Sequence, residues 1–275
     1  MVAGLVLSLR EGLEAALILG IVVGTLHKVG QDAHKRALWI GVGAAIAVSL
    51  GVGLGLTLMG SRLEGISEEI FEGTTMFLAA GVLTWAIFWM RSQAGRRRQT
   101  LKTGVEYAVQ QGRWGIAVLA FIAVVREGIE LSVFLTASAL SAGIANTMLG
   151  ASVGILLAVG LGWGTYHQLI KLNMRTFFQV TGAVLIVFAA GLTGHGMHEF
   201  IEVGWIPGLI SPLWNLDPFL PESSGLGQIL TALFGYQSSP SLTELLGYLA
   251  YIVVIAFAVV QKSEPGLPAA DGSLP

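Results

Sequence analysis

The sequence has no cysteine and little charge. None of its 275 residues is Cys and only 12% are Asp, Glu, Lys or Arg, against roughly a quarter in an ordinary soluble domain. Without thiols there are no disulfides, thiolate metal sites or thiol redox chemistry, so any metal must be bound by oxygen or imidazole. With 54% hydrophobic residues and a mean hydropathy of +0.74, a soluble globular protein is excluded. The net charge of −2 gives no reason to expect a nucleic-acid partner.

Seven apolar stretches fill most of the chain, and each is long enough to cross the ~30 Å hydrocarbon core as a helix. We predict spans at residues 2–26, 37–59, 70–90, 114–140, 147–170, 177–197 and 242–260. The first stretch has no basic segment before it and no clear cleavage site, so we expect a retained helix and not a signal peptide. The predicted fold is therefore an all-α polytopic membrane protein with seven transmembrane helices.

Lys and Arg fall almost entirely on one side of these spans. The first, third and fifth loops and the C-terminal tail hold twelve of them, whereas the opposite loops hold only Arg62. Because basic loops stay in the cytoplasm, we expect a plasma (inner) membrane protein with its N-terminus outside and its tail, residues 262–275, inside. The basic run 96–98 is expected to contact anionic membrane lipid. The outer loops carry a net charge of about −8, which would attract a cation from outside.

Short motifs recur in the same order in the two halves of the chain. Arg-Glu-Gly-Leu-Glu at 10–14 recurs as Arg-Glu-Gly-Ile-Glu at 126–130, Val-Gly-Leu-Gly at 52–55 recurs at 159–162, and Ala-Ala-Gly at 79–81 recurs at 189–191. Because three spans separate the copies, the halves face opposite ways, as in many secondary transporters. We predict a 3 + 3 inverted repeat of residues 1–90 and 114–199, an external loop at 203–241 and a seventh helix at 242–261.

The doubled first motif places charge in the middle of two predicted spans. Its charged residues are Arg10, Glu11 and Glu14 in the first span and Arg126, Glu127 and Glu130 in the fourth. Within each motif the three share one helical face. Charges at this depth cost several kcal/mol unless they are paired or hydrated, so they are functional candidates. Four carboxylates and two guanidinium groups leave a charge of −2, which suits a hard multivalent cation. The alternative is that each motif only forms an ion pair that holds helices together.

The chain resembles a known family, the oxidase-linked iron permeases, which comprise the fungal high-affinity iron permeases and the permeases of bacterial ferrous iron uptake systems. The resemblance covers nearly the whole chain and rests on the paired Arg-Glu-Gly-x-Glu motifs, with support from Phe-Glu-Gly at 71–73 and His-Glu at 198–199. It implies seven helices and iron permeation. The metal ligands that it implies are Glu11, Glu14, Glu127 and Glu130, with Arg10 and Arg126 pairing charge.

Further candidate ligands lie at the outer ends of two predicted spans. They are His195, His198, Glu199 and Glu202 on one helical face of the sixth span, and Glu72 at the start of the third. We expect them to capture a cation and pass it to the buried carboxylates. The alternative is an ordinary solvated helix terminus, where acidic residues are favoured by the helix dipole.

The external loop at 203–241 contains no Lys or Arg but several aromatic residues. We expect residues 226–233 to form a short interfacial helix. In relatives an iron-oxidising or iron-binding protein stands at this face, so the resemblance implies such a partner; a lid or anchor for the bundle is the alternative.

From the residues and the resemblance together, we predict an importer of iron ions, as Fe3+ after external oxidation, that is not an enzyme and has no permanently bound cofactor. The alternatives are a transporter of a divalent cation such as manganese or lead and, from other classes, an intramembrane enzyme or a scaffold subunit.

Overall fold

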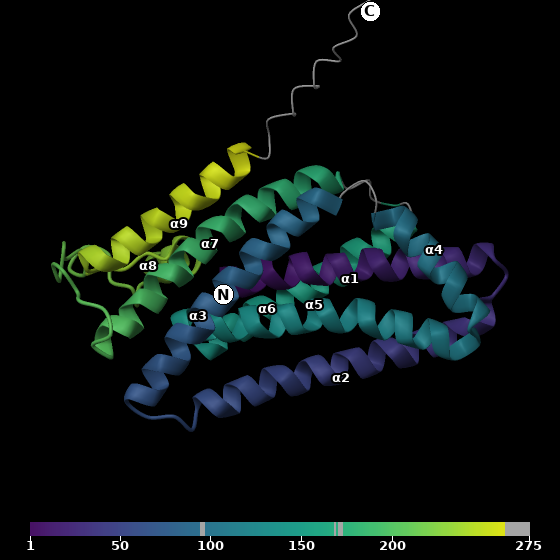
Figure 1. Cartoon of the computed structure of the whole chain (residues 1–275), viewed down its shortest axis with the longest axis horizontal. Helices are drawn as coiled ribbons and strands as arrows, with labels where there is room; N and C mark the ends of the chain where they lie inside the picture. The colour runs from purple at the N-terminus through teal and green to yellow at the C-terminus, as the bar shows by residue number, and fades with distance from the viewer. Residues whose placement is uncertain (94–96, 168, 170–172, 262–275) are drawn as a thin grey trace, which may run out of the picture.

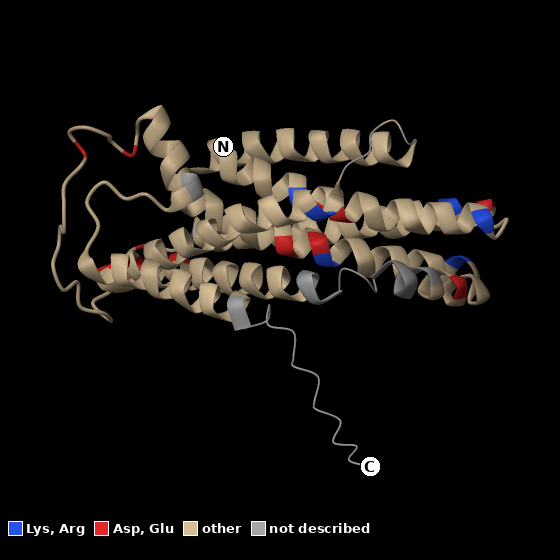
Figure 2. Ribbon diagram, turned by 90° about the horizontal axis from the view of Figure 1, so that it is seen from above, with Lys and Arg blue, Asp and Glu red and all other residues tan. Residues whose placement is uncertain are grey.

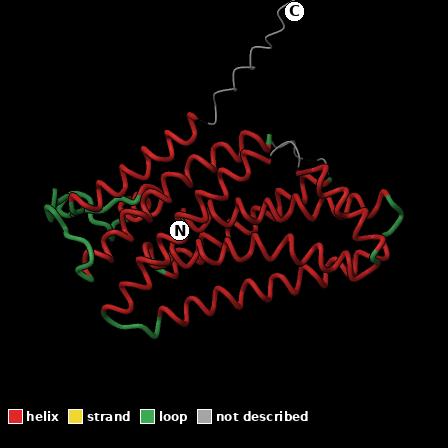
Figure 3. Tube along the Cα trace, in the orientation of Figure 1, coloured by secondary structure: helices red, strands yellow, loops and turns green. Residues whose placement is uncertain are grey.

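The computed structural model describes residues 1–93, 97–167, 169 and 173–261. Within these ranges the chain is helical and contains no strand (Figures 1 and 3). The long helices are α1 (Val2–Lys28), α2 (Lys35–Gly60), α3 (Ile66–Gln93), α5 (Gly112–Ala142), α6 (Ile144–Tyr166), α7 (Met174–Glu202) and α9 (Leu242–Gln261). The short ones are η1 (Asp32–His34), α4 (Arg97–Gln110) and α8 (Gly225–Phe234). Each predicted span overlaps one long helix; the predicted tail 262–275, Arg96 and Lys171 lie outside the described residues.

Five helices are long and apolar enough to cross a membrane. They lie within Asp32–Gly60, Ile66–Trp89, Ile144–Tyr166, Met174–Glu202 and Leu242–Val259. Helices α2 and α6 expose large apolar side chains at the surface of the bundle, as a lipid-facing helix does: Leu54 and Leu156 are 63% and 72% exposed. The chain is therefore a multi-pass membrane protein. Helices α1 and α5 have 27 and 31 residues, but each carries a charged motif near its middle, which lowers its hydropathy.

The helices form two groups that lie side by side (Figure 1). In one group α1 packs along α6, α2 packs along α5, and α1 also contacts α5. In the other group α7 lies between α3 and α9. Contacts of α3 with α5 and of α1 with α7 join the groups, so α1 and α5, which carry the charged motifs, are central in the bundle.

Glycine allows the closest helix contacts. A Cβ atom at Gly150 of α6 would meet the backbone carbonyl oxygen of Met1, and a Cβ atom at Gly41 of α2 would meet that of Ala117 in α5. Small residues at such positions let helix backbones approach in a membrane, where dispersion and not water exclusion drives association. The pairs α1–α6 and α2–α5 are thus fixed in register by backbone contact.

Helix α4 lies in residues 91–113, where the sequence predicts only a basic cytoplasmic loop between the third and fourth spans. It packs on α5 and α1, with Val105 and Ala108 buried. Their spacing of three residues places them on one helical face, so this face of α4 packs on the bundle, while Tyr107 on another face is 64% exposed.

The expected short helix in the external loop is present as α8. Its N-terminus is capped by Ser224, whose hydroxyl accepts a 3.0 Å hydrogen bond from the Gly227 amide, and it ends at Gly235, which has a positive φ of 65°. Helix α8 packs against α1, α5 and α7, and Gly235 touches Gly191 of α7 so closely that a Cβ atom on either would meet the other's backbone. The segment that carries α8 is therefore anchored against the bundle.

Candidate metal site

The two charged motifs lie where the apolar core is interrupted. Along α1, one buried apolar cluster ends at Leu7 and the other begins at Ile18. Along α5, one ends at Val124 and the other begins at Phe134. Figure 2 shows the interruption as red and blue segments near the middle of the bundle. Both motifs occupy the gap between these clusters, which brings carboxylates of the two helices close to one another.

Both motifs are also far from the helix ends. Glu11 is nine residues from the start of α1, which is about 14 Å along the axis. Glu127 is the central residue of the 31-residue helix α5, with roughly 22 Å of helix on either side. Since the hydrocarbon core is ~30 Å thick, these depths correspond to the middle of a membrane.

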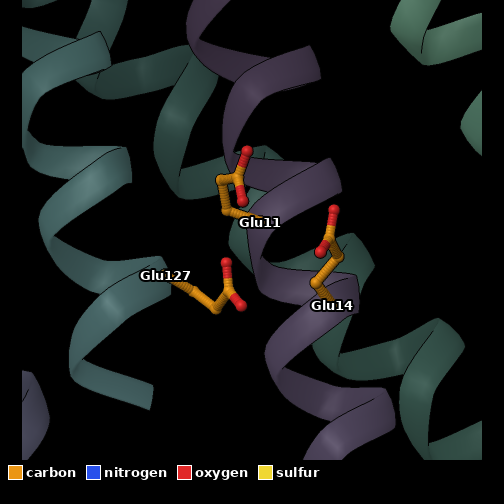
Figure 4. A group of neighbouring side chains, drawn as sticks. All are labelled: Glu11, Glu14 and Glu127. Atoms are coloured by element: carbon orange, nitrogen blue, oxygen red, sulfur yellow. The ribbon is translucent and has the colours of Figure 1, made fainter. Parts of the chain in front are cut away.

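Three carboxylates converge in this gap. One oxygen from each of Glu11, Glu14 and Glu127 lies within 4.8 Å of the other two, and all three side chains are at most 3% exposed. Figure 4 shows Glu127 extending from α5 toward the two glutamates of α1. The arrangement offers a hard cation several oxygen ligands from two helices at once.

Arg10 supplies positive charge to this cluster from the same helix. Its guanidinium donates to the neighbouring carboxylate of Glu11, and its Nη2 lies 3.3 Å from Glu14 Oε1. The side chain is only 1% exposed, so the charge is buried with its partners. One guanidinium beside three carboxylates leaves the group acidic if all of them are ionised.

Glu11 has unused ligand capacity. Its Oε2 atom is buried and accepts no hydrogen bond from any residue in the described ranges. A buried acceptor without a partner costs about 1–3 kcal/mol, and more when it is charged. A bound cation would satisfy this oxygen.

The second motif is arranged differently from the first. Arg126 donates from Nε to Glu130 Oε1 over 2.9 Å, and its side chain is 31% exposed. Its guanidinium lies over the ring of Trp89 in α3, with Cζ 4.0 Å from the ring centroid. Glu130 is buried but is not among the three converging carboxylates. The two copies of the motif therefore have different surroundings.

The outer candidates on α3 and α7 meet where these helices cross. A Cβ atom at Gly73 would touch the side chains of Glu199 and Phe200, which brings Glu199 next to the turn that carries Glu72. The Phe200 ring stacks on Phe77 with centroids 5.5 Å apart. Glu72 and Glu199 are both partly buried, so they face each other across a packed contact and are not simple surface charges.

The two histidines have different hydrogen bonds. His198 has both ring nitrogens near carboxylates, with Nδ1 3.1 Å from Glu244 and Nε2 3.3 Å from Glu202. His195 Nδ1 lies 3.0 Å from the Gly191 carbonyl oxygen, which can only accept, so Nδ1 carries the proton. The neutral ring of His195 then presents a lone pair at Nε2, as metal-binding histidines commonly do.

Two residues near these groups were missed from the sequence. Glu244 is 4% exposed and accepts a 2.7 Å hydrogen bond from the Ser241 hydroxyl besides its contact with His198. Its place in a Ser-x-x-Glu pattern at the start of the seventh predicted span is the available signal. The other residue is Trp89, and nothing in its local sequence indicates its contact with Arg126.

Comparison with known proteins gives a family match over almost the whole chain. The iron permease FTR1 family matches residues 1–263. No solved structure matches the chain.

Individual relatives agree in length and coverage. An uncharacterized protein of Archaeoglobus fulgidus is 36% identical over 261 residues, which cover 91% of this chain and 92% of the relative. The ferrous iron permease EfeU of Shigella sonnei is 32% identical over 261 residues, covering 93% and 94%. The same-named protein of Yersinia pestis is 30% identical over 262 residues, covering 94% and 93%.

Proposed function

Because this chain belongs to the iron permease FTR1 family, we propose that it imports iron through a mid-membrane site of Glu11, Glu14, Glu127 and Glu130. The observation that carries the proposal is the convergence of three buried carboxylates from two helices within 4.8 Å. Arg10 and Arg126 balance part of their charge. Iron is the transported substrate here, and the chain acts as a permease and not as an enzyme.

The ligand set favours ferric iron at this site. The converging atoms are all carboxylate oxygens, and hard oxygen ligands prefer hard cations. Several relatives are named ferrous iron permeases, so in this proposal an external iron-oxidising protein takes one electron from Fe2+ before entry. Manganese and lead are the competing substrates. A ferric preference predicts that neither divalent ion competes with iron at equal concentration.

We place all seven long helices across the plasma (inner) membrane. Twelve Lys and Arg residues in alternate connections and the tail oppose Arg62, which favours an outer N-terminus and a cytoplasmic C-terminus. In this orientation α4 and its basic neighbours lie at the lipid surface inside, and α8 lies outside. α1 and α5 can cross the membrane despite their charged motifs, because the charged groups are paired within the bundle.

An inverted repeat of residues 1–90 and 114–199 is supported by the helix contacts. A shift of 116 residues takes Met1 to Ala117 and a shift of 109 takes Gly41 to Gly150, which turns the α2–α5 contact into the α6–α1 contact. The same shifts relate the contact of Gly12 with Ala158 to that of Gly128 with Ser49, and the contact of Ala16 with Gly162 to that of Ser132 with Gly53. For α2 and α6 these contacts give an offset of 109 residues, whereas the Val-Gly-Leu-Gly match between the same helices gives an offset of 107.

The outer residues act in this proposal as a capture site. Glu72, Glu199 and Glu202 supply carboxylates, and His195 supplies a lone pair at Nε2. His198 bridges Glu202 and Glu244, so it holds these carboxylates in place, and it becomes a ligand itself when one ring nitrogen releases its carboxylate. A cation captured here passes inward to the three converging glutamates.

Iron uptake into proteoliposomes that contain only this protein tests the function. We expect accumulation of radioactive iron by the wild type, and none by the Glu14→Gln and Glu127→Gln variants at equal protein content. Neither an enzyme nor a scaffold subunit would accumulate iron alone. Wild-type accumulation that the glutamine variants match would contradict the proposed site.

A further inference from the structure

The two arginines of the repeated motif approach the glutamate cluster from opposite sides. Each arginine precedes its glutamates in sequence, but α1 and α5 are antiparallel. This follows because α1 contacts α6 in parallel, from Met1 at Gly150 to Ala16 at Gly162, and α6 follows α5 after a turn at Gly143. Arg10 therefore lies toward the end of the bundle that carries α8, and Arg126 toward the end that carries α4.

The two guanidinium groups have different partners. Arg10 is 1% exposed and bonded to two carboxylates of its own motif. Arg126 is 31% exposed, bonds Glu130 through Nε, and lies with Cζ 4.0 Å from the Trp89 ring centroid and 5.2 Å from that of Trp85. A cation this close to an indole face is attracted by the ring quadrupole, most strongly when it is shielded from water.

We propose that Trp89 is a positioning residue for iron binding, acting through Arg126; this inference rests on the proposed function. The ring holds the guanidinium against Glu130. Without the ring, the long Arg126 side chain gains rotamers directed at Glu127, which follows it in the chain and belongs to the converging group. A tethered guanidinium there competes with iron for an oxygen of the converging group, whereas at Glu130 it pairs with a carboxylate outside that group.

The neighbours of Trp89 indicate that its aromatic face, and not merely its volume, positions Arg126. Trp85 stacks beside Trp89 with centroids 6.0 Å apart, so a smaller aromatic ring at position 89 retains a neighbour that supports it. Phenylalanine also has a face that attracts a cation, though less strongly than Trp. Leucine fills much of the volume but offers no such face.

Iron dependence of uptake by proteoliposomes is the first test. We expect Trp89→Leu to raise the half-saturating iron concentration roughly tenfold with the maximal rate preserved, and Trp89→Phe to restore most of the affinity. Trp114→Leu is the matched control, because Arg113 also lies over this ring, 5.8 Å from its centroid, at a helix start far from the glutamates. A Trp89→Phe variant as defective as Trp89→Leu, or a Trp89→Leu variant with wild-type affinity, would overturn the inference.

A second measurement does not depend on transport. The thermal midpoints of the purified Trp89→Leu and Arg126→Gln proteins and of the double variant form a cycle. If the ring acts through Arg126, the decreases in thermal midpoint of the two single variants do not add. The double variant then unfolds close to the more affected single variant. Additive decreases in a protein that transports iron refute this inference alone. Absence of wild-type uptake refutes the proposed function, while the cycle still decides whether the ring and the guanidinium are coupled.

Discussion

Glu127→Gln separates a metal site from an ion pair by the sign of its effect on stability. Glutamine keeps the size of the side chain and removes one charge. If the carboxylates exist to bind a cation, they repel one another in the metal-free protein, and the substitution relieves that repulsion. If they exist to hold helices together, the substitution breaks a buried pair and destabilises the protein.

The distances set the magnitude. Two ionised carboxylates with oxygens at most 4.8 Å apart repel by at least about 3.5 kcal/mol at an effective dielectric constant of about 20. Glu127 faces Glu11 and Glu14, and Arg10 offsets part of both repulsions. We therefore expect the metal-free Glu127→Gln protein to be no less stable than the wild type and up to several kcal/mol more stable. Breaking a buried ion pair would instead cost roughly 3–5 kcal/mol.

The assay is thermal unfolding of the purified protein with and without iron. Iron at a hundred times its dissociation constant stabilises the wild type by about 2.7 kcal/mol, so its midpoint rises. The variant should lose this rise, because removal of a direct ligand weakens binding by more than the roughly 10- to 100-fold effect of an outer-shell change. Glu106→Gln, at an exposed position of α4, should behave like the wild type. A Glu127→Gln protein that is destabilised and still stabilised by iron would refute the metal-site argument.

Three further outcomes are expected. Reporters fused after Gln31 and Ser223 should report the cytoplasm and the outside respectively, and a cytoplasmic signal at Ser223 would contradict the seven-span arrangement. Gly41→Val should destabilise the protein by roughly 1–3 kcal/mol, because its Cβ would meet the Ala117 carbonyl oxygen, whereas Gly43→Ala has open space; equal unfolding midpoints would contradict the α2–α5 contact. His195→Gln should raise the half-saturating iron concentration without changing the maximal uptake rate, and loss of rate at saturating iron would place His195 on the permeation path.

The hydropathy of the chain predicts both its membrane environment and its helical backbone. Long apolar stretches require a membrane, and in lipid every backbone N–H and C=O must be satisfied within its own segment. Helix formation is therefore local and could be predicted from hydropathy, as could the location of the charged motifs in α1 and α5. Helix α4 does not stand out in the sequence because its apolar residues are few; it packs on the next helix, α5, and on the distant α1.

Which charged groups meet depends on how the helices pack. The sequence predicts four equivalent glutamates, but Glu11, Glu14 and Glu127 converge while Glu130 pairs with Arg126. Likewise, nothing within α9 indicates that Glu244 bonds His198. The register of one helix against another is set by backbone contacts at glycines such as Gly41 and Gly150, and Arg126 lies over the Trp89 ring of a third helix. These contacts join segments far apart in the chain, so the spacing within any one helix contains no information about them.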